Sequence, residues 1–317
     1  MSSKDATKVL AANSETCRMA ACALARGELV ALPTETVYGL AARADREEAV
    51  AQIFAAKGRP SFNPLIVHVR DAAHARRYAV FTDVAERLAK RFWPGPLTLV
   101  LPKLPGAELA PAVSAGLPTI AMRCPAHPVM REVLELCDFS LAAPSANRSG
   151  GVSPTSAAHV KQGMGGRIQM VVDGGASQAG IESTIVAVRE NGSIEELRPG
   201  PITMAEIGKD HAKKLRGATS ACRIVEAPGM TTRHYAPGKP MRLRAMDASS
   251  DEFHIGFGTI TGHRNLSPNG NLEEAAHDLY AALHEAARSS RPRIAVAPIP
   301  DEGAGKAIND RLRRAAA

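Results

Sequence analysis

Apolar and polar positions follow two different periods along residues 15–207, which predicts a mixture of helices and strands. Apolar side chains recurring on one helical face predict helices over residues 15–25, 47–56, 84–92, 128–136 and 155–163. Short runs rich in Leu, Ile and Val predict strands over residues 29–32, 65–69, 97–101, 119–122, 140–143, 169–172, 183–188 and 194–198. Because such runs suit strands buried on both faces, the pattern predicts an α/β or α+β domain built on one large twisted sheet.

The pattern in residues 239–317 is simpler and predicts a second, smaller α/β domain. Strands are expected over residues 241–244, 252–257 and 293–297, and a short helix over residues 304–315. The strongest periodicity lies in residues 272–288, where Leu272, Leu279 and Leu283 fall on one face with three alanines.

Residues 209–240 separate these two regions and are rich in basic, small and turn-forming side chains. This composition predicts a linker. The expected organisation is therefore a catalytic domain over residues 1–208, a linker over 209–240 and a C-terminal domain over 241–317. The linker also carries Thr-Thr-Arg-His-Tyr at residues 231–235, a polar and aromatic cluster that a plain spacer does not need.

Composition narrows the class of protein. No apolar stretch is long enough to span a membrane, and residues 1–13 lack the apolar core of a secretory signal. The five cysteines are scattered with no CxxC pair, which favours reduced thiols, a cytoplasmic location and no zinc site. The net charge of +7 suits a polyanionic partner such as a nucleotide or RNA, although an ordinary basic surface explains it equally well.

Two segments near the N-terminus carry clusters of polar side chains. Residues 32–40 read Leu-Pro-Thr-Glu-Thr-Val-Tyr-Gly-Leu after a predicted strand, where ligands often bind in α/β folds. Residues 57–65 place Lys57 and Arg59 on a loop constrained by glycine and proline, where both side chains can face one polyphosphate. Each segment also has a structural explanation, as a tight turn or as charges at a helix C-terminus.

Three later segments add to this set. Arg123 ends an apolar strand, where it needs an anionic partner such as a substrate carboxylate or an internal acid. Residues 142–155 join a strand to a helix through hydroxyl, amide and glycine residues that suit phosphate binding, yet contain no P-loop or dinucleotide fingerprint. Residues 180–186 open a strand with Glu182 and Ser183, and Arg198 closes the next strand.

Taken in order, these motifs resemble those of a known family. The strings PTETVYGL, KGRPSFNPLIVHV, TIAMRCP, APSANRSGGVSPT, IESTIV, LRPGP and RHYAPGKP are similar to threonylcarbamoyl-AMP synthases of the YrdC-like fold, in the long two-domain form. The ending AINDRLRRAA resembles the second domain of that family. The resemblance is dense over residues 15–240 and looser beyond.

The resemblance implies a twisted mixed sheet around a positively charged cavity, followed by a small Rossmann-like C-terminal domain. It implies the synthesis of threonylcarbamoyl-AMP from L-threonine, bicarbonate and ATP with Mg²⁺, and a downstream tRNA threonylcarbamoyl transferase as a transient partner. By position it implies a polar tetrad at the phosphates, formed by Lys57, Arg59, Ser145 and Asn147. It implies ATP contacts at Arg59, Asn63, Thr119, Ser145, Ser153 and Arg198, with Tyr235 of the linker folding over the nucleotide. It implies threonine contacts at Thr36, His68, Arg123, Ala143 and Ser183.

Two other functions are compatible with parts of the sequence. A basic α/β module that recognises double-stranded RNA or tRNA by shape fits the net charge, so direct tRNA binding stays open. A carbamoyl transferase of hydrogenase maturation shares the fold, but those enzymes are larger and carry cysteine pairs that this chain lacks. The sequence does not name metal ligands, because Mg²⁺ often binds mainly to phosphates and water.

Overall fold

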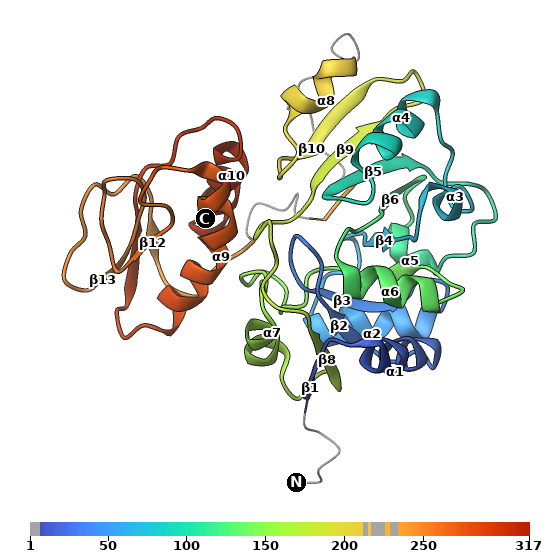
Figure 1. Cartoon of the computed structure of the whole chain (residues 1–317), viewed down its shortest axis with the longest axis horizontal. Coiled ribbons are helices and arrows are strands. Elements are labelled where there is room, and N and C mark those ends of the chain that lie inside the picture. Colours follow the sequence, from blue (N-terminus) through green and yellow to red (C-terminus); the bar gives the residue numbers. More distant parts are fainter. Residues whose placement is uncertain (1–6, 212–214, 217–225, 229–233) are drawn as a thin grey trace.

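The structure is a computed structural model that describes residues 7–211, 215–216, 226–228 and 234–317. The chain forms two units, a large one around an eleven-stranded sheet and a C-terminal one around a four-stranded sheet (Figure 1). Of the linker predicted over residues 209–240, residues 212–214, 217–225 and 229–233 lie outside the described residues, including Thr231, Thr232 and Arg233 of the polar cluster.

The large sheet is mixed, and its strands run in the order β1-β8-β2-β3-β7-β4-β6-β5-β9-β10-β11. The strands are β1 (Lys8–Ala11), β2 (Val30–Leu32), β3 (Gly39–Arg43), β4 (Ile66–His68), β5 (Leu97–Pro102), β6 (Thr119–Arg123), β7 (Leu141–Ala142), β8 (Met170–Asp173), β9 (Thr184–Val188), β10 (Ile194–Arg198) and β11 (Leu215–Arg216). Strands β4 and β6 are parallel, with His68 and Arg123 as register partners, so their functional ends coincide.

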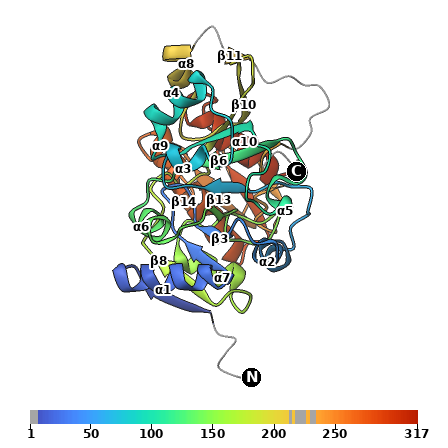
Figure 2. The same ribbon diagram turned by 90° about the vertical axis from the view of Figure 1, so that its right-hand side faces the viewer.

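Helices cover both faces of this sheet. They are α1 (Ser14–Ala25), α2 (Glu47–Lys57), α3 (Ala72–Ala75), α4 (Asp83–Phe92), α5 (Pro111–Ser114), α6 (Pro128–Leu136), α7 (Ala157–Met164) and α8 (Met204–His211). Figure 2 shows α1, α2 and α7 towards one end of the large unit and α4 and α8 towards the other. None of the described helices is long and apolar enough to cross a membrane.

The alternation of side chains along β2 divides the core between the two faces. Ala31 packs in the cluster that contains residues of α2 and α4, whereas Val30 and Leu32 pack with α1 and α6. Successive strand residues point to opposite faces, so a strand covered on both sides must be apolar throughout. This is why many of the predicted strands appear in the sequence as short runs rich in Leu, Ile and Val.

The C-terminal unit has an all-parallel sheet in the order β12-β15-β13-β14. Its elements are β12 (Met241–Arg242), β13 (Glu252–Gly256), β14 (Arg264–Asn265), α9 (Leu272–Arg288), β15 (Arg293–Val296) and α10 (Gly305–Ala315). The helices α9 and α10 lie on the side that faces the large unit (Figure 1).

The two units share one apolar cluster. Val37, Val152 and Ile181 of the large unit pack with residues of α9 and α10. Gly180 has a φ of +69°, and a Cβ there would lie 2.2 Å from the carbonyl oxygen of His277 in α9. The close approach of α9 therefore requires glycine at residue 180.

Most of the predicted elements are confirmed, including the helices at 128–136 and 272–288, which match to the residue. The sequence pattern missed β1, β3 and β14 and the short helices α3 and α5. Strand β11 pairs with β10, so the large sheet includes two residues of the segment predicted as linker. The boundary at residue 208 stays a prediction.

Candidate functional site

A small cavity lies where the strand ends and loops that carry the sequence motifs meet the end of the linker. Its volume is about 50 Å³, which is room for a few water molecules and not for a nucleotide. The large unit supplies most of the wall, and Pro228, His234 and Tyr235 close it from the linker. A larger hollow of about 860 Å³ lies between α1, the edge strand β1 and its neighbour β8, and it shares no lining residue with the small cavity.

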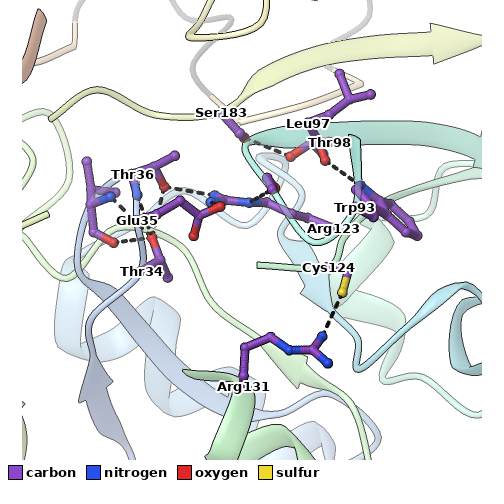
Figure 3. Close-up of polar contacts among 12 residues, drawn as sticks. Thr34, Glu35, Thr36, Trp93, Leu97, Thr98, Arg123, Cys124, Arg131 and Ser183 are labelled. Atoms are coloured by element: carbon purple, nitrogen blue, oxygen red, sulfur yellow. Dashed lines mark hydrogen bonds and ion pairs between the residues drawn. The ribbon is translucent and has the colours of Figure 1, made fainter. Parts of the chain in front are cut away.

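Arg123, at the end of β6, is held in the wall by an ion pair and two hydrogen bonds. Its Nη2 lies 2.6 Å from Oε1 of Glu35, its Nη1 donates to Thr36 Oγ1 at 2.8 Å, and its Nε donates to the carbonyl of Gly95 at 3.1 Å (Figure 3). Burial opposes ionisation of Glu35, but the charge of Arg123 outweighs it and lowers the pKa of that carboxyl. The guanidinium is thereby fixed in one orientation, which suits recognition of a carboxylate.

Arg59 enters the wall from the loop after α2. Gly58 ends that helix in the left-handed region, with φ at +60°, and turns the chain so that Arg59 points inward. Arg59 donates to the carbonyls of Asn63 at 3.2 Å and Pro64 at 2.8 Å. Burial lowers the pKa of Arg59 to about 10, so it remains a cation at neutral pH.

Lys57 has a different place from the one expected, because it does not line the cavity. Its Nζ donates at 2.5 Å to the carbonyl of Ser145 and at 2.5 Å to that of Asn147, and only 2% of the residue is exposed. Burial lowers its pKa well below the ordinary value. In this structure, Lys57 shapes the loop that carries Ser145, whereas Arg59 faces the cavity.

The far wall is built around Arg198 at the end of β10. Its Nη2 donates to the carbonyl of Ser183 at 2.9 Å and to Ser183 Oγ at 3.1 Å, and its Nη1 donates to the carbonyl of Pro228 at 3.2 Å. Ser183 Oγ also lies 2.7 Å from the hydroxyl of Thr98 (Figure 3). Arg198 thus connects the strand ends to the linker.

Two histidines at the cavity are neutral. Burial, together with the charge of Arg123, lowers the pKa of His68 to about 3, and burial likewise lowers the pKa of His234 to about 3. The Nδ1 atoms of both rings are buried without a hydrogen-bond partner among the described residues. Neutral imidazoles can donate or accept a hydrogen bond to a substrate without adding charge.

A buried carboxylate, that of Glu182, completes the wall. It accepts hydrogen bonds from Ser153 Oγ at 2.5 Å, Tyr280 Oη at 2.8 Å and Arg311 Nε at 2.9 Å. Tyr280 and Arg311 belong to α9 and α10 of the C-terminal unit. The cavity wall therefore combines three arginines with one carboxylate whose partners come from both units.

Comparison with known proteins gives the same assignment over both units. Residues 22–200 match the Sua5/YciO/YrdC family, described as Telomere recombination, and residues 193–317 match the family described as Threonylcarbamoyl-AMP synthase, C-terminal domain. Curated threonylcarbamoyl-AMP synthases of Pyrococcus abyssi and Bacillus subtilis are each 39% identical, over 94% and 98% of this chain and 93% and 96% of theirs. The chain belongs to the threonylcarbamoyl-AMP synthase family.

The structural likeness extends to the arrangement of the two units. A crystal structure of P. abyssi Sua5 complexed with L-threonine matches with a TM-score of 0.89 at 36% identity, covering 98% of each chain. The YrdC-like fold predicted from the sequence motifs is confirmed.

Nine of the residues expected at the site line the cavity together: Thr36, Arg59, His68, Arg123, Ala143, Ser145, Ser183, Arg198 and Tyr235. Five do not line it. Lys57, Asn63, Asn147 and Ser153 lie behind the wall and hold its members or its loops. Thr119 begins β6, roughly 13 Å from Arg123 at the strand's other end. The roles that the family resemblance implies for all these residues stay predictions.

Sequence reasoning left several residues in the cavity wall or directly behind it without a role. Glu35 and Glu182 occur in strings already singled out, PTETVYGL and IESTIV, but a single carboxylate in a loop gives no sign that it will be buried. His234 was noted only as part of the linker cluster. Tyr280 sits on the regular face of a predicted helix, so nothing distinguished it from core.

The described residues contain no group of three or more His, Cys, Asp or Glu side chains able to hold a metal ion. Both carboxylates at the cavity are already engaged by arginines. The donor set therefore does not form a cage of protein ligands for a cation. These side chains fit a metal ion that enters already bound to phosphate oxygens and water.

Proposed function

We propose that this chain synthesises threonylcarbamoyl-AMP from L-threonine, bicarbonate and ATP, acting as a nucleotidyltransferase. The observation that carries the proposal is the convergence of Arg59, Arg123 and Arg198, from three separate segments, on one cavity. Membership of the synthase family and the likeness to a threonine-bound relative support it.

The chemistry has two steps. The threonine amine attacks carbon dioxide, derived from bicarbonate, and loses a proton to give a carbamate. A carbamate oxygen then attacks the α-phosphorus of ATP, and the bond from that phosphorus to the bridging oxygen breaks to release pyrophosphate. No covalent enzyme intermediate is needed, so positioning and electrostatics are sufficient.

The residues of the cavity suit distinct parts of this reaction. Arg123, oriented by Glu35 and Thr36, would bind the threonine carboxylate. Arg59 and Arg198 are placed to neutralise charge that builds on the phosphates. Mg²⁺ would enter with the triphosphate and supply further neutralisation of that charge.

The small size of the cavity supports a linker that moves to admit ATP. About 50 Å³ does not accommodate ATP, and His234 and Tyr235 of the linker occupy part of the space beside Arg59 and Arg198. We infer that the linker withdraws for ATP to enter and returns to exclude water. A closed site would protect the carbamate, which decomposes readily in water.

The product is a mixed anhydride, which suits transfer of its threonylcarbamoyl group to tRNA by a separate transferase in the cytoplasm. Cys17, Cys22, Cys124 and Cys137 are free thiols, which is compatible with a reducing compartment. The cavity gives no specific support to the alternative of a tRNA-binding module, because about 50 Å³ is too small for a nucleic acid.

The direct test is incubation of the full chain with L-threonine, bicarbonate, ATP and Mg²⁺, with mass detection of the mixed anhydride and measurement of pyrophosphate. Pyrophosphate release should depend on threonine and should fall by roughly 100-fold in Arg59→Ala. Arg76→Ala, which removes an exposed arginine elsewhere in the unit, is the matched control and should behave as wild type. Absence of threonine-dependent pyrophosphate from the wild-type chain would refute the proposal.

A further inference from the structure

The C-terminal unit reaches the wall of the catalytic cavity through one arginine. Arg311 of α10 is fully buried and donates from Nε to Oε2 of Glu182, 129 residues away in sequence. Its Nη1 lies 2.8 Å from Asp310, which is its neighbour on the helix. Glu182 itself lines the cavity, so only one side chain separates Arg311 from the space where the reaction would occur.

Arg311 also holds a second wall residue. Its guanidinium carbon lies 5.4 Å from the centre of the Tyr235 ring, and that ring stacks on Tyr280 with centroids 5.7 Å apart. Tyr235 has a φ of +67°, a left-handed conformation that an aromatic residue adopts only when its surroundings impose it. The contacts with Arg311 and Tyr280 supply that constraint.

Stability alone does not account for an arginine at this place. The surrounding cluster is apolar, and apolar residues of similar volume usually replace a buried ion pair with no loss of stability. The arginine instead provides what an apolar side chain lacks, which is a fixed direction for the Glu182 carboxylate and a cation against the Tyr235 ring.

We propose that Arg311 is a positioning residue for the reaction of the large unit, acting through Glu182 and Tyr235. The C-terminal unit would then complete the catalytic cavity rather than serve as an independent module. This inference rests on the proposed synthase activity and assigns a role in it to the second unit.

The ionisation of Glu182 gives the proposal a measurable signature. Burial alone would raise the pKa of Glu182, but the charges of Arg311 and Arg198 and the hydrogen bond from Ser153 outweigh it and lower the pKa to about 2. Tyr280, Tyr235 and His234 also face this carboxylate and are neutral. A group with a lowered pKa keeps its charge until the pH falls through that value, so wild-type Glu182 stays ionised throughout the mildly acidic range.

Removal of the Arg311 charge raises the pKa of Glu182, so the carboxylate gains its proton at a higher pH. In Arg311→Gln, kcat for threonine-dependent pyrophosphate release should fall by roughly 10- to 100-fold at neutral pH, because wall residues lose their alignment. The acid limb of the pH profile should move to higher pH. Arg311→Lys, which restores the charge without the planar fork, should return the acid limb towards its wild-type position.

Two further variants separate positioning from a general loss of structure. Arg293→Gln removes an exposed ion pair with Asp251 in the same unit and should leave kcat and the pH profile unchanged. The double variant Glu182→Gln/Arg311→Gln should lose the displaced acid limb, because the titrating group is gone. If Arg311→Gln does not fold, Tyr280→Phe removes another donor to the same oxygen and should move the acid limb in the same direction by less.

The outcomes are distinct. A folded Arg311→Gln with wild-type kcat and pH profile would overturn the inference, as would a lower kcat with an unmoved acid limb, which indicates a purely structural role. An acid limb of the pH profile that stays at its wild-type position in Tyr280→Phe would also overturn the inference. A wild-type chain that makes no threonylcarbamoyl-AMP would instead refute the proposed function.

Discussion

Two buried ion pairs flank the same cavity, and they differ in which partner faces the ligand. In the pair Arg123–Glu35 the cation lines the cavity, the carboxylate lies behind it, and both belong to the large unit. In the pair Arg311–Glu182 the carboxylate lines the cavity, and the cation comes from the C-terminal unit. The first pair presents a positive charge to the cavity, whereas the second makes part of the cavity wall depend on a separate unit of the chain.

The largest effect is expected for Arg123→Met, which removes the cation of the first pair. We expect threonine-dependent turnover to fall by at least roughly 100-fold, because the cation that faces the carboxylate is lost. The free energy of unfolding should fall by about 3–5 kcal/mol, because Glu35 stays buried without its partner. Pyrophosphate release and urea unfolding measure the two effects.

A double variant separates these two effects of the Arg123 substitution. Arg123→Met/Glu35→Leu removes the uncompensated carboxylate and should recover most of the stability while remaining inactive. Recovery of activity in this variant would show that Arg123 supports the fold and does not bind substrate.

A smaller effect is expected on the rise in Tm that L-threonine causes. This rise should differ between variants of the two carboxylates, Glu35 and Glu182. Glu35→Gln leaves Arg123 buried without a counter-ion, so the unliganded protein should lose about 1–3 kcal/mol. The carboxylate of bound threonine would replace the missing counter-ion of Arg123, so L-threonine should raise the Tm of this variant more than that of wild type. Glu182→Gln should not show the larger rise, and equal shifts in all three proteins would contradict the assignment of Arg123.

The smallest effect is expected for an exposed pair of the same chemistry. Arg76 and Glu86 lie 2.6 Å apart, as close as Arg123 and Glu35, but half of the arginine side chain is exposed. Water already solvates both charges, so Arg76→Gln should leave the midpoint of urea unfolding within experimental error. A clear shift would show that distance, and not burial, decides the value of these pairs.

Periodicity predicted the long elements of the fold and missed the short ones, for a physical reason. The helix α9 has seventeen residues and several repeats of its apolar face, so its limits are readable. The edge strand β1 is mostly exposed and only four residues long, and it depends on pairing with β8, which is more than 150 residues away. The residues of β1 alone do not predict pairing with a strand so far away in the sequence.

The sequence was sufficient to predict which segments form the site. It was not sufficient to predict which side chains contact one another there. Arg123 could be placed at a strand end because it ends an apolar run, and Arg198 because Pro199 and Gly200 follow it directly. Nothing local indicated that Lys57 turns towards two carbonyls while Arg59 turns to the cavity, since a left-handed Gly58 separates them. The partnership of Glu182 with Arg311 requires the packing of two units, which no motif in either segment encodes.

The separation of 129 residues between Glu182 and Arg311 has a consequence during synthesis. A ribosome adding 5–20 residues each second takes on the order of ten seconds to cover that interval. Over this time the strands of the large sheet can assemble, but the carboxylate of Glu182 lacks its ion-pair partner Arg311 and has only the charge of Arg198 nearby. If the proposed roles hold, a nascent chain carries all three arginines of the cavity before its wall is complete, and turnover would have to wait for α10 to dock.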